Sequence, residues 1–165
     1  MSKKILVVSD SHGNTANLRK AIEVFGPRGE QLELLIHLGD IQGEVESIER
    51  LVDCPVEAVS GNCDFIPQLP GTKIITIEGQ KVLLTHGHRY GCKAGTEQMK
   101  ELARANGAGL VLYGHTHIPM IDEHSGIKAM NPGSISQPRQ EGHRPTYLVI
   151  TIEDDGRWEY AVVTM

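Results

Sequence analysis

The sequence predicts an α/β fold, a layered sandwich in which two β-sheets carry helices on their outer faces. In the first half, buried apolar runs alternate with segments of helical periodicity, which indicates strands and helices in turn. The second half consists mainly of short strand-like runs, and the last two are joined at Asp155-Gly156, a dipeptide typical of hairpin turns. Because a strand-rich half does not fit a single doubly wound sheet, two sheets with outer helices are favoured.

The first half contains three runs that are rich in branched apolar residues, as in strands buried on both faces. Apolar residues at helical spacing follow the first run, from Leu18 to Phe25, and Gly26-Pro27 ends that helix. A shorter helix is predicted over residues 45–52. The three strands are predicted at residues 4–9, 32–38 and 56–60.

The second half begins with a hairpin over residues 73–85 that turns at Glu78-Gly79. Thr96 is predicted to cap a helix with an apolar stripe that includes Met99, and Gly107 ends this helix. The remaining strands are predicted at residues 110–113, 119–122, 127–130, 147–152 and 157–163.

The composition is that of an ordinary globular protein. Of the 165 residues, 39% are hydrophobic and 22% are charged, which excludes intrinsic disorder and predicts one domain over residues 1–165. The net charge is −5 and only 4% of the residues are aromatic. Proteins that coat nucleic acid carry a basic stripe and aromatic stacking platforms, so strong nucleic-acid binding is not expected.

The cysteines and the N-terminal segment predict a cytoplasmic protein without membrane attachment. Cys54, Cys63 and Cys92 are odd in number and form no C-x-x-C pair, which favours reduced intracellular thiols. The first apolar run ends at Ser9-Asp10, too early for a signal peptide, and no later run is long enough for a membrane span.

Five of the predicted strands end in a polar motif beside a glycine. In open α/β sheets, ligands bind outside the carboxyl ends of the strands. If these strands lie in parallel, the five motifs therefore meet in one cleft. The motifs are Asp10-Ser11-His12-Gly13, Gly39-Asp40, Gly61-Asn62-Cys63-Asp64, His86-Gly87-His88 and Gly114-His115-Thr116-His117.

These motifs supply the ligands of a metal centre. Carboxylates and imidazoles with one amide and no thiolate suit divalent ions such as Mn²⁺, Fe²⁺, Zn²⁺ or Ni²⁺. Seven ligands are too many for one ion, and they fit two ions about 3.5–4 Å apart that share a carboxylate. The seven candidates are Asp10, His12, Asp40, Asn62, His86, His115 and His117.

Three of the eight histidines lie outside the motifs. His37 falls within a predicted strand and is expected in the core with its ring nitrogens satisfied. His124 and His143 fall in loop-like stretches and are expected on the surface. The low aromatic content also predicts an open polar cleft with little surface on which a base could stack.

The ordered set D-x-H, G-D, G-N-x-D, H-G-H and G-H-T-H resembles the calcineurin-like metallophosphoesterase superfamily. It is most similar to the branch of small stand-alone prokaryotic phosphodiesterases, and the resemblance extends from Asp10 to Ser134. It implies a four-layer αββα sandwich with two mixed β-sheets flanked by helices. It also implies hydrolysis of a small phosphodiester or cyclic nucleotide at a dinuclear metal centre, with Mn²⁺ as the expected ion and Ni²⁺, Fe²⁺ or Zn²⁺ as alternatives.

The resemblance assigns the seven candidates to two ions. The first ion would be bound by one carboxylate and two imidazoles, those of Asp10, His12 and His117. The second would be bound by one amide and two imidazoles, those of Asn62, His86 and His115. Asp40 would bridge both ions, and a hydroxide between them would attack phosphorus in line. Asp40, Asn62 and His86 would thereby serve catalysis as well as metal binding.

Cys63 departs from the superfamily pattern. The usual motif is G-N-H-[DE], whose histidine is the proposed general acid, and this chain has Cys63 at that position. Protonation of a poor leaving group is worth roughly 10²–10⁴-fold in rate. We therefore expect slow turnover and a preference for activated or strained diesters, such as aryl esters and 2′,3′-cyclic nucleotides.

Weaker assignments concern the substrate and the loops around it. Asn62, Cys63, His88 and Arg139 are candidate substrate contacts, although His88 also suits a role in bracing its loop. Arg139 is a candidate for bidentate contact with phosphate. Asp64 is expected to orient its motif rather than bind metal.

Other functions are consistent with the same fold. The alternatives are a phosphomonoesterase, a non-hydrolytic nucleotide or metal sensor, and a catalytically weak scaffold for protein partners, as in a eukaryotic retromer subunit. A scaffold predicts lost ligands, whereas all seven positions are filled here. The physiological substrate, the native metal and the oligomeric state stay open, since Trp158 and Tyr160 suit either the core or the contact of a homo-oligomer.

Overall fold

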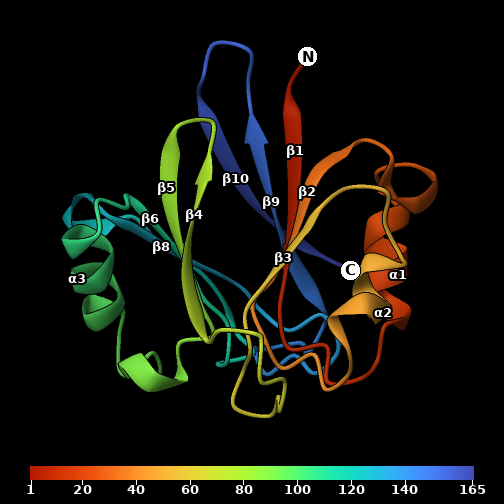
Figure 1. The fold of residues 1–165 in the computed structure, drawn as a ribbon, viewed down its shortest axis with the longest axis horizontal. Coiled ribbons are helices and arrows are strands. Elements are labelled where there is room, and N and C mark those ends of the chain that lie inside the picture. Colours follow the sequence, from red (N-terminus) through yellow and green to blue (C-terminus); the bar gives the residue numbers. More distant parts are fainter.

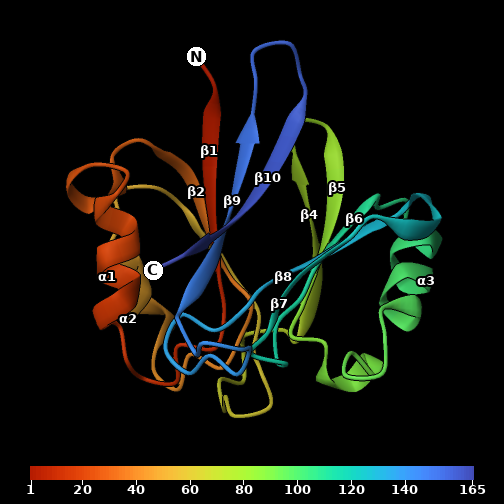
Figure 2. The same ribbon diagram turned by 180° about the vertical axis from the view of Figure 1, so that it is seen from behind.

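Two five-stranded β-sheets lie face to face, and helices cover their outer faces (Figure 1). The structure is a computed structural model that describes residues 1–165. Helices α1 (Ala16–Glu23) and α2 (Val45–Glu49) lie outside one sheet, and α3 (Glu97–Ala105) lies outside the other, as the reverse view also shows (Figure 2). This arrangement confirms the four-layer αββα sandwich.

The first sheet has the strand order β10-β9-β1-β2-β3. Its three N-terminal strands are parallel, and β9 is antiparallel to both of its neighbours, β1 and β10. The strands are β1 (Lys3–Val8), β2 (Leu32–His37), β3 (Val56–Ala58), β9 (Thr146–Ile152) and β10 (Trp158–Thr164).

The second sheet has the order β4-β5-β6-β8-β7. Strands β5, β6 and β8 are parallel, and the two edge strands are antiparallel to their neighbours. Both sheets are therefore mixed. The strands are β4 (Thr72–Ile77), β5 (Gln80–Thr85), β6 (Leu110–Leu112), β7 (Pro119–Asp122) and β8 (Lys128–Pro132).

Three apolar clusters hold the four layers together. Side chains alternate along a strand, so Ile5 of β1 faces the second sheet while Leu6 faces the helices. The cluster between the sheets joins Ile5 to Leu84 of β5 and Leu112 of β6. The outer clusters join each sheet to its helices, as Met99 of α3 does. No helix has the length and apolar character needed to cross a membrane.

Thr96 occupies the predicted N-cap position of α3, but its side chain is used for a tertiary contact. Thr96 makes no side-chain capping bond, and its hydroxyl instead donates to Oδ2 of Asp122 at 2.6 Å. The same carboxylate oxygen accepts from Nζ of Lys100, which is fully buried, at 3.0 Å. Asp122 thus ties α3 to strand β7, 26 residues after Thr96 in the chain.

We expect Asp122→Asn to destabilise the metal-free protein by about 2 kcal/mol at pH 7, because hydrogen bonds to a charged group are lost. Hydrogen bonds from Thr96 and from the backbone of His124 hold the pKa of Asp122 well below its usual range. A depressed pKa stabilises the fold above the unfolded value of about 3.9 and loses this effect as the pH falls through the folded value. The difference in free energy of unfolding between variant and wild type should therefore shrink at pH 3 or below.

Urea unfolding at pH 7 and at low pH measures this difference. The exposed carboxylate of Asp154 provides the control, and Asp154→Asn should change stability little at either pH. An equal loss of stability for Asp122→Asn at both pH values would show that the charge of Asp122 is unimportant.

Candidate metal centre

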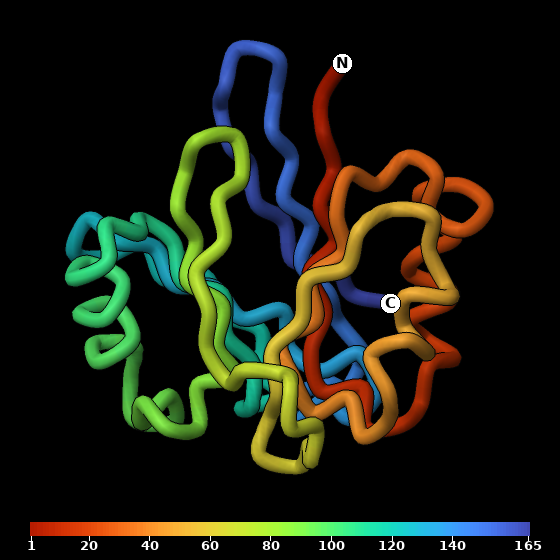
Figure 3. Tube along the Cα trace, in the orientation of Figure 1, coloured from red at the N-terminus to blue at the C-terminus, as the bar shows by residue number.

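All five polar motifs lie at the same end of the two sheets. Three follow β1, β2 and β3 in the first sheet, and two follow β5 and β6 in the second (Figure 3). The motif-bearing strands are parallel within each sheet, as the sequence argument required. The motifs, however, meet between two sheets rather than at the end of one, because the two sheets present their motif-bearing ends on the same side.

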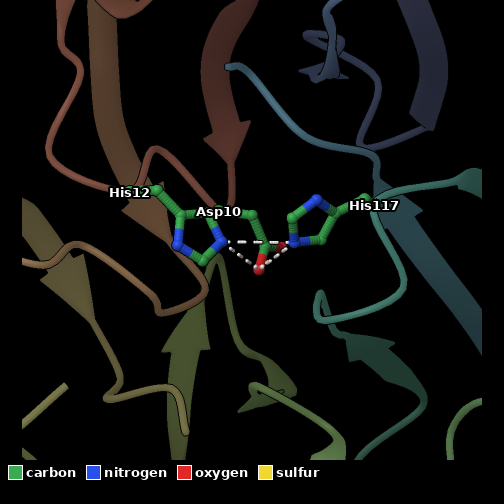
Figure 4. A group of neighbouring side chains, drawn as sticks. All are labelled: Asp10, His12 and His117. Carbon is green, nitrogen blue, oxygen red and sulfur yellow. Dashed lines mark hydrogen bonds and ion pairs between the residues drawn. The ribbon is translucent and has the colours of Figure 1, made fainter. Parts of the chain in front are cut away.

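The first group of ligand atoms comes from Asp10, His12 and His117 (Figure 4). Asp10 follows β1, and its Oδ1 lies 3.3 Å from Nε2 of His117 and 3.7 Å from Nε2 of His12. The two Nε2 atoms are 3.2 Å apart. Side chains separated by more than 100 residues in the chain thus place three ligand atoms around one point.

In the first group, the three ligand atoms direct lone pairs, rather than hydrogens, toward one another. Nδ1 of His117 donates to the backbone oxygen of Gln137 at 2.6 Å, which leaves Nε2 without a proton in the neutral ring. Nδ1 of His12 faces Oε1 of Gln42 at 2.5 Å and leaves its own Nε2 bare in the same way. Oδ1 of Asp10 is buried and has no hydrogen-bond partner. Three acceptors around one point fit a bound cation.

The second group comes from Asp40, Asn62, His86 and His115. Nδ1 of His86 donates to the backbone oxygen of Leu38 at 2.7 Å, so its Nε2 is also bare. This Nε2 lies 3.0 Å from Oδ1 of Asn62, 3.2 Å from Oδ2 of Asp40 and 3.2 Å from Nδ1 of His115. The second group, like the first, offers acceptors to a cation.

Asp40 lies between the two groups. Its Oδ2 is 3.2 Å from Nε2 of His86 in the second group and 3.6 Å from Nε2 of His12 in the first. Its Oδ1 accepts the backbone N–H of Cys63 at 2.8 Å, which fixes the orientation of the carboxylate. A carboxylate in this position suits two ions that share one ligand.

At two of the candidate ligands, Asp10 and His115, electrostatics favour the protonation state that metal binding needs. Burial raises the pKa of Asp10, but the imidazoles of His117 and His12 more than offset this effect and hold the pKa well below its usual range. Burial, together with the neighbouring His86 and Lys93, lowers the pKa of His115 to about 4. Asp10 is therefore ionised and His115 neutral at pH 7, the forms in which these side chains bind metals.

Backbone strain is concentrated at the candidate ligands. Ten residues other than glycine have positive φ, and five of them belong to the proposed ligand set. Such a conformation costs of order 1–3 kcal/mol for an ordinary side chain and is typical of functional sites. The five are Asp10 (φ 55°), His12 (47°), Asp40 (57°), His115 (71°) and His117 (61°).

Gly61 is required by the close approach of its backbone to Asp40. A Cβ at this position would lie 2.1 Å from Oδ1 of Asp40 and 2.5 Å from its backbone nitrogen. We expect Gly61→Ala to displace the carboxylate and to weaken metal binding by about 10–100-fold, the range seen when groups that orient ligands are lost. Titration calorimetry with Mn²⁺ measures the effect.

Gly109→Ala is the matched control, because a Cβ at Gly109 would meet nothing within 4 Å. Thermal unfolding of the metal-free variants separates lost affinity from lost folding. Wild-type affinity in a folded Gly61→Ala variant would contradict the proposed position of Asp40.

The candidate substrate contacts lie around the centre. Asn62 is exposed and Cys63 half-buried, and one ligand atom each of His12, Asp40 and Cys63 lies within 4.8 Å of the others. His88 is half-buried, and its ring centroid is 5.4 Å from that of His86. Arg139 is exposed, and its backbone N–H donates to the oxygen of His117 at 3.0 Å. The roles of these four residues stay predictions.

Several supporting residues complete the site. His37 is fully buried. The backbone N–H of Gly39 donates to its Nδ1 at 3.1 Å, and its Nε2 lies 2.9 Å from the hydroxyl oxygen of Ser11. Both ring nitrogens therefore have partners, as expected for a core histidine. Asp64 accepts three backbone N–H groups, those of Gly61, Ile41 and Gln42, and so joins the loops after β2 and β3.

Sequence reasoning missed the contacts that orient the imidazoles. The partners are the side chain of Gln42 and the backbone oxygens of Leu38 and Gln137. A backbone oxygen carries no side-chain signal, and Gln42 has no recognisable spacing from the ligands. Only the folded chain identifies them.

The fold and the site together define a class: α/β sandwich proteins that hold metal through carboxylates and imidazoles at the ends of their strands. Residues 4–155 match the model of the calcineurin-like phosphoesterase superfamily domain. The chain belongs to this family, which confirms the resemblance carried by the five motifs.

Named relatives are similar over most of the chain. Probable metallophosphoesterase YsnB of Bacillus subtilis is 34% identical over 152 residues, which cover 92% of this chain and 85% of YsnB. Phosphodiesterase YfcE of Escherichia coli is 30% identical over 158 residues, which cover 82% of this chain and 81% of YfcE. The crystal structure of a predicted phosphoesterase from Streptococcus pneumoniae has a TM-score of 0.79 at 26% identity and covers 100% of this chain and 99% of that one. The family and these relatives identify a phosphoesterase of the small prokaryotic branch.

Proposed function

We propose that this protein is a divalent-metal-dependent phosphodiesterase that hydrolyses a small phosphodiester or cyclic nucleotide at a dinuclear centre. The observation that carries the proposal is the arrangement of two groups of acceptor atoms around a shared carboxylate, that of Asp40. The name of the relative YfcE supports a diester substrate. Residues 1–165 supply all seven ligands and act in this proposal as one domain.

In this mechanism Asp10, His12 and His117 would hold the first ion and Asn62, His86 and His115 the second, with Asp40 between them. Such ions would supply a water of lowered pKa and would neutralise the charge that develops on the phosphate. The protein fixes the geometry through hydrogen bonds to the outer nitrogens of the imidazoles.

Asn62 has a second role in the proposed reaction. Its Oδ1 faces Nε2 of His86 and Nδ1 of His115, both at 3.0 Å. Asn62 is exposed, and one N–H of its Nδ2 group donates to Sγ of Cys63 at 3.6 Å, which leaves the other N–H. This N–H group is therefore available to donate to a phosphate oxygen of the substrate and to orient it.

Hydrolysis of bis-p-nitrophenyl phosphate tests the proposal. The protein is stripped of metal with a chelator, and activity is measured after addition of Mn²⁺ or Ni²⁺, with the number of bound ions determined in the same samples. We expect no activity without metal and restored activity at two ions per chain. Two bound ions without hydrolysis of this diester under any divalent ion would overturn the enzyme assignment and favour a binding module.

Mn²⁺ is the proposed native ion, with Ni²⁺, Fe²⁺ or Zn²⁺ as alternatives, because oxygen and imidazole ligands suit all four. Elemental analysis of protein purified without added metal identifies the ion.

A cytoplasmic location is proposed because the three free cysteines suit a reducing compartment.

A further inference from the structure

A pocket of about 390 Å³ lies on the side of the second sheet, and its lining includes residues that adjoin the candidate ligands in the chain. This volume lies toward the lower end of the range of about 300–1,000 Å³ that ligand pockets occupy. Its apolar lining comes from Cys92, Tyr113, Ile118 and Met120.

Two of the lining residues are attached directly to the proposed ligand set. Thr116, one of its lining residues, lies in the chain between the two histidines His115 and His117. Arg139, another lining residue, is attached to His117 by a backbone hydrogen bond of 3.0 Å. A molecule bound through its phosphate at the metal centre therefore has this pocket as its neighbour.

The pocket has an apolar wall that remains exposed to solvent. Ile118 is 44% exposed and Met120 is 47% exposed, although both are large apolar residues. The hydroxyl of Tyr113 donates to the sulfur of Met120 at 3.3 Å and fixes the thioether at the wall. This wall is aliphatic and offers apolar surface although the chain has few aromatic residues.

Two cations complete the lining. Lys93 and Arg139 are exposed, and neither side chain forms an ion pair. In a chain with a net charge of −5, two unpaired cations beside an anion-binding centre favour an anionic ligand. A thioether and two cations are also groups that interact favourably with aromatic rings.

We propose that this pocket is the specificity subsite for an aromatic substituent of the phosphoester, whose phosphate lies at the metal centre. Met120 and Ile118 contact the ring, and Lys93 and Arg139 face the ring or the phosphate. The inference rests on the proposed function, since it requires the metal centre to bind the phosphate. It goes further by naming the class of substrate: esters that carry an aromatic group close to the scissile phosphate.

Binding of two non-hydrolysable probes tests the subsite. Phenylphosphonate and methylphosphonate share the anionic group and differ only in the organic substituent, and their affinities for the Mn²⁺-loaded protein are measured by titration calorimetry. We expect phenylphosphonate to bind at least about tenfold more tightly, a difference of 1.4 kcal/mol. In Met120→Asn this preference should fall to about twofold or less.

Ile121→Asn is the matched control. Ile121 is 41% exposed and follows Met120 on the same edge strand, β7, but it does not line the pocket. Its variant should keep the preference of the wild type. Because both substitutions place the same neutral polar side chain on neighbouring positions, a general effect on the strand would appear in both.

The outcomes separate the subsite from the proposed function. The subsite would be overturned if the wild type bound the two phosphonates equally well, or if Met120→Asn left the preference unchanged. The proposed function would still stand if the protein hydrolysed bis-p-nitrophenyl phosphate. Absence of both phosphonate binding and hydrolysis would overturn both. A preference lost in Met120→Asn and retained in Ile121→Asn supports the subsite.

Discussion

Replacing Asp40 with asparagine is expected to lower kcat/KM for bis-p-nitrophenyl phosphate by at least about 10³-fold. The carboxylate lies between the two groups of ligand atoms, 3.2 Å from Nε2 of His86 and 3.6 Å from Nε2 of His12. An amide has a similar shape but lacks the charge that holds two cations close together. Metal ions supply several kcal/mol of transition-state stabilisation, and each 1.36 kcal/mol is worth a factor of about ten in rate.

The number of bound ions provides a readout that does not depend on turnover. Asp40→Asn should bind fewer than two ions per chain at concentrations that saturate the wild type. Asp53→Asn, which alters an exposed carboxylate paired with Arg28, is the control and should keep both properties. Normal turnover in Asp40→Asn would overturn the dinuclear assignment.

Replacing Cys63 with histidine is expected to raise the rate on diesters with poor leaving groups by about 10²-fold or more relative to aryl diesters. Burial and the negative charge of Asp40 raise the pKa of the Cys63 thiol, so it is a weak acid at neutral pH. The backbone N–H of Cys63 is fixed on Oδ1 of Asp40 at 2.8 Å. A histidine at this position would start from the same anchored backbone and could protonate a leaving oxygen.

The measurement compares a dialkyl phosphodiester with bis-p-nitrophenyl phosphate in wild type and variant. Cys63→Asn is the control, because its amide is polar but donates no proton to a leaving group. An unchanged ratio of the two rates in Cys63→His would refute the idea that the missing general acid limits this enzyme. A rise in both rates alike would do the same.

Local sequence signals predicted most elements of the fold. The hairpin turn was placed at Glu78-Gly79, and both residues have positive φ, at 47° and 78°. This agreement is expected because turn geometry depends on the turn residues themselves. Strand positions were predicted within one or two residues, since a strand buried on both faces leaves a continuous apolar run.

The errors occur where distant residues take over local hydrogen-bonding groups. The second helix was predicted over residues 45–52, yet it ends at Glu49. Arg28, more than 20 residues earlier, donates to the backbone oxygens of Arg50 and Val52. The hydroxyl of Thr96 likewise bonds to Asp122 instead of capping its helix.

The sequence by itself indicated the candidate ligands and their positions at strand ends, because strand endings and glycine-flanked motifs are local features. The tertiary structure alone decided that the motifs of two different sheets meet, with Asp10 and His117 only 3.3 Å apart. It also decided which nitrogen of His12 and of His86 faces the candidate centre, through the partners Gln42 and the backbone oxygen of Leu38. Such contacts depend on how the sheets pack, and packing joins residues that no local pattern relates.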